Sequence, residues 1–187
     1  MADQKISAMP AATTLSGAEL VPLVQSGANV QTTISDLSAF TQTTYGGYGE
    51  IFVAGGTTSQ TTSGTANTYT TLTAFTSDGP DNGSVTADAA NDRLTLATGV
   101  YLVNFNATFT ASNNHTFLFR CFNSTTASAF ANTVAQNHTH STDPHQVGFT
   151  ALLSVTGTTN IIVQVASPDT SQPFVISEAN FIATRVG

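Results

Sequence analysis

The chain has 187 residues and a net charge of −7, and only 8% of its residues are charged, which predicts a polar but mostly neutral surface. Its four cations, Lys5, Arg93, Arg120 and Arg185, are too scattered to neutralise a row of phosphates, which argues against nucleic acid as a partner. No stretch approaches the ~20 apolar residues of a membrane span and the N-terminus shows no secretory signal, so we expect synthesis in a cytoplasm and no membrane contact.

Residues 1–44 are predicted to form an extended N-terminal arm, because Pro10 and Pro22 fix φ and lack the backbone N–H that an interior helix needs. The arm is too short and too extended to bury its own apolar residues. We expect a neighbouring protein to order it through Ile6, Leu15, Leu20, Val21, Leu23, Val24, Ile34 and Leu37. A disordered tail is the alternative, although disordered chains are usually poor in such residues.

Two local elements are expected within the arm. Residues 18–25 could form a short strand or a single turn, and a brief helix could follow, capped by Ser35 or Thr33. The glycine-rich run at 45–49 is predicted to be a hinge that ends the arm.

The pattern from Lys5 to Leu37 contains the blocks P-A-A-T-T and G-A-E-L-V-P. It resembles a leader at the N-termini of tailed-bacteriophage virion proteins, among them tail-fibre and capsid-decoration proteins. This resemblance implies a virion protein that is made in the host cytoplasm and attached to the particle through its arm.

Residues 50–187 contain short β-prone runs separated by turn residues, and no run has a helical period. In 99–110 the aromatic and aliphatic residues alternate with polar ones, which is typical of a strand with one buried face. Strands are expected at 50–54, 68–75, 84–87, 93–96, 99–110, 115–123, 129–134, 146–156, 160–166 and 174–185. About ten short antiparallel strands predict an all-β, antiparallel jelly-roll sandwich.

Residues 99–105, G-V-Y-L-V-N-F, resemble the G-x-Y-x-[FV]-x-[FV] strand of the trimeric jelly roll shared by tumour-necrosis-factor ligands and complement globular heads. The hairpin expected over 147–166 and the terminal strand at 174–185 resemble the same family. Its common Gly-Asp before the penultimate strand is absent, since Gly157-Thr158-Thr159-Asn160 stands there. The resemblance implies a homotrimer, and the 12 Phe and four Tyr fit a threefold interface or a generous monomer core.

His138 and His140 are the candidate metal ligands. On an extended chain they project to the same side, so two imidazoles could chelate one ion, and a threefold axis could bring six together. Trimeric phage fibre tips use H-x-H pairs in this way. The alternative is a solvated turn, which the neighbouring Thr, Ser, Asp and Pro residues favour.

The sequence offers no recognisable catalytic motif, so we expect neither an enzyme nor a cofactor. Asp78, Asp81, Asp88 and Asp92 could gather calcium ligands, but their spacing lacks EF-hand order and turn aspartates usually stabilise turns. Cys121, the only cysteine, is expected to be a small buried apolar residue.

These observations favour a homotrimeric capsid decoration or cement protein that binds the major capsid protein through its arm. The alternative is a receptor-binding tip or short tail fibre, whose partners would be tail proteins and a host receptor. A depolymerase is least favoured, because paired carboxylates cannot be assigned.

Overall fold

The computed structural model describes residues 18, 20–25, 28–37, 46–55, 57–112 and 114–187. The chain forms two compact units, Met1–Gln42 and Thr43–Gly187, and each is described by itself. Among the described residues, no helix is long and apolar enough to cross a membrane.

The N-terminal unit contains an antiparallel β-hairpin. Strand β1 (Leu20–Gln25) pairs with β2 (Ala28–Thr33), in a register that runs from Gln25 opposite Ala28 to Leu20 opposite Thr33. Of the two forms considered for 18–25, the strand is therefore the one observed. The second strand was not expected, because its polar residues show no apolar alternation and are placed by pairing with β1.

One helical turn at 34–37 follows the hairpin, and Thr33 caps it. The Asp36 N–H donates to Thr33 Oγ1 at 3.0 Å, and the Thr33 N–H donates back to Asp36 Oδ2 at 3.4 Å. This reciprocal pairing is a capping box, with Asp in the place that Glu or Gln usually takes. Of the two predicted caps, Thr33 is the one used.

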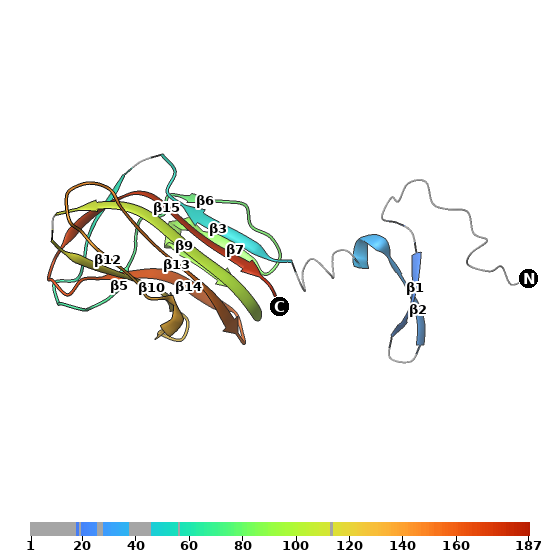
Figure 1. Ribbon diagram of the computed structural model, residues 1–187. Helices are drawn as coiled ribbons and strands as arrows, with labels where there is room; N and C mark the ends of the chain where they lie inside the picture. Colours follow the sequence, from blue (N-terminus) through green and yellow to red (C-terminus); the bar gives the residue numbers. More distant parts are fainter. Residues whose placement is uncertain (1–17, 19, 26–27, 38–45, 56, 113) are drawn as a thin grey trace, which may run out of the picture. The chain divides into compact units, whose positions relative to one another are not determined.

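The body is a sandwich of two antiparallel sheets (Figure 1). The six-stranded sheet has the order β13-β9-β15-β3-β6, and β4 also pairs with β15. Its strands are β3 (Tyr48–Phe52), β4 (Thr58–Thr61), β6 (Ser77–Asp78), β9 (Gly99–Ala111), β13 (His145–Val155) and β15 (Pro173–Arg185).

The seven-stranded sheet has the order β11-β10-β14-β8-β7, with β12 paired to β10 and β5 paired to β14. Its strands are β5 (Thr70–Thr71), β7 (Val85–Asp88), β8 (Arg93–Leu96), β10 (Thr116–Asn123), β11 (Ser128–Ala129), β12 (Ala135–His138) and β14 (Thr159–Ala166). Two short 3-10 helices, η2 (Ala89–Asn91) and η3 (Ala131–Thr133), complete the described body.

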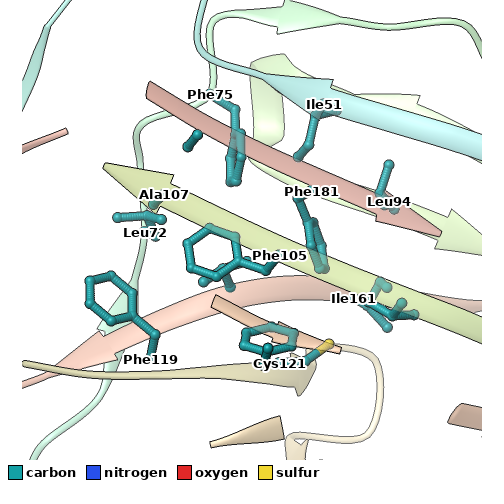
Figure 2. Close-up of a cluster of buried hydrophobic side chains, with 14 of the residues drawn as sticks. Ile51, Leu72, Phe75, Leu94, Phe105, Ala107, Phe119, Cys121, Ile161 and Phe181 are labelled. Carbon is teal, nitrogen blue, oxygen red and sulfur yellow. The ribbon is translucent and has the colours of Figure 1, made fainter. Parts of the chain in front are cut away.

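The core lies between the sheets and is rich in phenylalanine (Figure 2). Phe105 on β9 has no exposed surface, and its ring centroid lies 5.8 Å from that of Phe119 and 5.3 Å from that of Phe149. The alternation predicted for this strand is confirmed. Its buried residues are Tyr101, Val103, Phe105, Ala107 and Phe109.

The glycines of the expected hinge pack closely against the body. A Cβ on Gly47 would lie 1.9 Å from Ser84 Oγ, and one on Gly49 would lie 2.5 Å from Val85 Cγ1. Strand β3 already begins at Tyr48, so the prediction of a hinge over 45–49 is wrong for residues 47–49. Here glycine permits the close approach of two chain segments.

The predicted strand at 129–134 is also wrong, because η3 interrupts it. The Thr133 hydroxyl accepts a hydrogen bond from the Cys121 N–H at 2.9 Å and donates one to Phe130 O at 2.7 Å. The Thr133 side chain thus accepts the hydrogen bond from β10 that the backbone of a paired strand would otherwise accept. The strand predicted at 68–75 is reduced to β5, and the short strands β4, β6 and β12 were not anticipated.

We expect Phe105→Ala to lower the free energy of unfolding by about 3–5 kcal/mol, because it removes a buried ring and leaves a cavity. Denaturant unfolding of the full chain measures this. Thr86→Ala, at an exposed strand position, is the control and should change stability by no more than about 0.5 kcal/mol. Equal effects of the two substitutions would contradict the assignment of Phe105 to the centre of the core.

Candidate assembly surfaces

The outward side of the six-stranded sheet carries an apolar row at one end. We call this side, formed by the outward residues of β13, β9, β15 and β3, the assembly face. Leu152 is opposite Leu102 in the β13–β9 register, and Thr184 of β15 lies between Leu102 and Tyr48. The exposed fractions are 59% for Leu152, 42% for Leu102 and 44% for Tyr48. Large apolar side chains that line up across neighbouring strands are typical of a protein–protein contact.

The middle of the assembly face consists of linked amides. Asn104 Nδ2 donates to Thr150 Oγ1 at 2.7 Å, and Asn106 Nδ2 donates to Asn104 Oδ1. Gly148 makes room for this arrangement, because a Cβ there would lie 2.4 Å from Asn106 Oδ1. The face is therefore polar in its centre, and Glu50 lies in the same cross-strand row as Asn104, beyond Ile182.

A hollow lies beside this amide cluster, over β13, β9 and β15. It is lined by Asn106, Thr108, Gln146, Gly148, Glu178 and Asn180, among others. Glu178 is exposed, and Asn180 Nδ2 donates to Glu50 Oε1 at its margin. The hollow presents amide, hydroxyl and carboxylate groups, which suit hydrogen bonding to a polar partner.

His138 and His140 lie together, as the alternation predicts. Their ring centroids are 5.0 Å apart, both residues are exposed, and Thr139 between them is fully buried. Thr139 Oγ1 lies 2.7 Å from Ser112 O and His138 Nδ1 lies 2.9 Å from Thr116 Oγ1, so hydrogen bonds hold both the chain and one ring.

The other two histidines have different neighbours. His115 Nδ1 lies 2.9 Å from Asp169 Oδ2, and the His145 ring packs on Phe109. In the described part of the chain, no three His, Cys, Asp or Glu residues gather as a metal site would require. A metal ion at His138 and His140 would need further ligands from another subunit or from solvent, and metal binding there stays a prediction.

The aspartates considered for calcium hold turns in place. Asp78 Oδ1 accepts a hydrogen bond from the Ala89 N–H at 2.6 Å, and Asp81 Oδ2 accepts one from the Ala87 N–H at 2.9 Å. Hydrogen bonds from the Asn91 side chain lower the pKa of Asp88, which also pairs with Arg93 at 2.8 Å.

Asp92 is the fourth of these residues, and its Oδ1 accepts a hydrogen bond from the Phe75 N–H at 3.1 Å. Burial raises the pKa of this carboxyl group. Its φ of 52° places it in the left-handed region, as suits an Asp that ends a 3-10 turn. All four carboxylates therefore serve local structure.

The candidate residues of the arm differ in their exposure. Leu20 is 61% exposed and Leu37 is 40% exposed, whereas Val21 and Ile34 are half-buried. Leu23 and Val24 lie on β1, but their side chains fall outside the described part, and Ile6 and Leu15 are outside the described residues altogether.

The sequence contains a signal for the assembly face. Leu102 and Leu152 occupy outward positions in strands that otherwise alternate apolar and polar residues. An apolar residue out of phase with such a strand places apolar surface on the outward side of the sheet. The cross-strand pairing that joins the two leucines appears only in the folded register.

No protein-family model and no curated protein matches the chain. Solved structures do match: Eiger TNF from S. frugiperda is 11% identical, with a TM-score of 0.56 over 76% of this chain and 94% of that chain. Murine APRIL at pH 5.0 is 12% identical, with a TM-score of 0.52 over 75% of this chain and 99% of that chain. At this identity the likeness shows the fold, and the predicted antiparallel jelly roll is confirmed as TNF-like.

We expect Cys121 to be unreactive in the native protein. Its side chain has no exposed surface and burial raises the pKa of its thiol, so both access and thiolate formation are suppressed. A thiol-specific reagent at pH 8 should label the chain only after denaturation, followed by absorbance or intact mass. Prompt stoichiometric labelling of the native chain would contradict this environment.

Proposed function

We propose that the protein is a homotrimeric structural component of a tailed-bacteriophage virion, a capsid decoration or cement protein that binds the major capsid protein through its N-terminal unit. The observation that carries the proposal is the location of the phage-leader pattern, Lys5 to Leu37, within a compact unit separate from the jelly roll. The proposal assigns the chain no catalytic role.

The assembly face supports the trimer. Leu102, Leu152 and Tyr48 leave apolar surface in water in a single chain. Next to them lie the uncharged amides of Asn104 and Asn106, and the carboxylates of Glu50 and Glu178 lie farther along the face. A threefold contact across this face would remove the leucines from water, which is worth about 1.5–3 kcal/mol for each side chain fully buried. The resemblance to trimeric jelly rolls points to the same assembly.

The N-terminal unit supports attachment to the particle. Leu20 and Leu37 are exposed on it, and its hairpin has only two strands. A two-stranded sheet is at best marginally stable by itself in water, so a partner that adds contacts would stabilise it. A trimer presents three such units, and once one unit is bound the others bind at a high effective concentration.

We expect deletion of residues 1–42 to leave a folded trimer that no longer binds particles lacking this protein. The body keeps its whole core, whereas the attachment unit is lost. Light scattering measures the trimer and co-sedimentation measures binding. A truncated chain that still decorates the particle would refute attachment through this unit.

A single substitution tests whether Leu20 takes part in this attachment. Leu20→Asp should weaken binding by about tenfold or more if the side chain is buried on the particle. Ser35→Asp adds the same charge at an exposed position of the same unit and should bind as the native chain does. Electron microscopy of intact particles gives the copy number: hundreds of copies support a capsid component, whereas about a dozen would support a tail component.

We expect Leu152→Asp to convert the trimer into a monomer, because it places a charge in the proposed contact without disturbing a residue that the monomer buries. The mass from light scattering should fall from three times 19.3 kDa to 19.3 kDa. Thr86→Asp, at an exposed position of the other sheet, should leave the mass unchanged. A native chain that is monomeric, or a Leu152→Asp chain that stays trimeric, would rule out this contact.

A further inference from the structure

Pro22 determines which opposite residues of the N-terminal hairpin exchange hydrogen bonds. In an antiparallel ladder, opposite residues alternate between pairs that exchange both N–H···O bonds and pairs that exchange none. Pro22 lies opposite Gln31 and has no N–H, so this pair must be of the second kind. The adjacent pairs, Val21 with Thr32 and Leu23 with Val30, are then the hydrogen-bonded ones.

As a result of this alternation, the two outer edges of the hairpin differ in the backbone N–H groups that they offer to a further strand. The outward backbone groups of β1 belong to Leu20, Pro22 and Val24, so a donor is missing in the middle of that edge. Proline at an edge is a common protection against pairing with another strand. The β1 edge is therefore poorly suited to accept a further strand.

The outer edge of β2 has no such interruption. Its outward groups belong to Asn29, Gln31 and Thr33, and the sequence A-N-V-Q-T-T contains no Pro and no charged residue. The Thr33 N–H lies 3.4 Å from Asp36 Oδ2 in the capping box, so the helical turn closes that end of the edge. Asn29 and Gln31 each keep an outward N–H and C=O with no partner strand among the described residues.

We propose that the β2 edge of the hairpin accepts a β-strand from the protein to which the N-terminal unit binds. The strand adds to the hairpin as a third strand, with main-chain hydrogen bonds to Asn29 and Gln31. This inference rests on the proposed function, in which that protein is the major capsid protein, and specifies which part of the unit makes the attachment.

Symmetry argues that the added strand comes from another protein. Two β2 edges that pair antiparallel with each other are related by a twofold axis, which a trimer does not contain. A cyclic arrangement, β2 of each subunit against β1 of the next, would need the β1 edge that Pro22 interrupts. Neither arrangement can therefore pair the β2 edges of three hairpins around a threefold axis.

Two matched proline substitutions in the full chain test whether the β2 edge accepts a strand. Gln31→Pro removes an outward N–H from β2, and Val24→Pro removes one from β1, and neither N–H is used inside the hairpin. Binding is measured with particles that lack this protein. We expect the apparent Kd to rise about tenfold or more for Gln31→Pro and to change by less than about threefold for Val24→Pro. Equal losses for both variants would overturn the inference.

Hydrogen exchange of the native chain tests the same edge without any substitution. On binding to the particle, the Asn29 and Gln31 amides should gain protection, and the Leu20 and Val24 amides should gain less. The reverse order would overturn the assignment of the edge. A disulfide between two Gln31→Cys chains on the particle would place a second copy there and would also overturn it.

The outcomes separate this inference from the proposed function. If the chain without residues 1–42 still binds, attachment through the N-terminal unit is wrong. If that deletion abolishes binding but Gln31→Pro and Val24→Pro bind alike, the unit attaches without strand addition at β2.

Discussion

The pairing of β9 with β13 on one side and β15 on the other is the constraint on which the body depends. β9 runs for 13 residues, and its pleat sends Phe105 and Phe109 into the core and Leu102 and Asn104 outward. A slip of one residue in either register would exchange these two sets, burying amides and exposing phenylalanines. The core and the assembly face are thus two consequences of one register.

One local feature in each neighbouring strand makes these two registers possible. Gly148 on β13 leaves space for the Asn106 amide, which a Cβ would obstruct. A register shift between Ile176 and Glu178 on β15 absorbs one extra residue and restores the inward direction of the buried residues beyond it. The same shift sets Glu178 beside the hollow of the assembly face.

The two units of the chain differ in the sheets that the structure describes in them. The body encloses an aromatic core between two sheets. The described hairpin of the N-terminal unit has two strands of six residues, and a two-stranded sheet by itself is at best marginally stable in water. The two edges of the hairpin differ, since Pro22 interrupts the β1 edge and β2 contains no proline, and the proposed strand addition depends on this difference.

Strands with an alternating pattern, long or short, could be predicted from the sequence to within a residue, whereas β4 and β6 could not. The predictions at 93–96, 99–110 and 174–185 match β8, β9 and β15, because one face of each meets the core and imposes a period of two. Strand β4, T-S-Q-T, has no such pattern, since only pairing with β15 places it. The predicted strand at 129–134 failed because Thr133 pairs with Cys121 through a side chain, which no periodicity reveals.

The sequence by itself determined the all-β class, the separate N-terminal segment and the adjacency of His138 and His140, because each follows from local pattern: alternation, proline placement and spacing along an extended strand. Only the tertiary structure decided that Leu102 and Leu152 form one apolar row and that Gly47 and Gly49 pack against Ser84 and Val85. These depend on which segments meet across the fold, and pairing between distant segments is a property of the whole chain that no local pattern encodes.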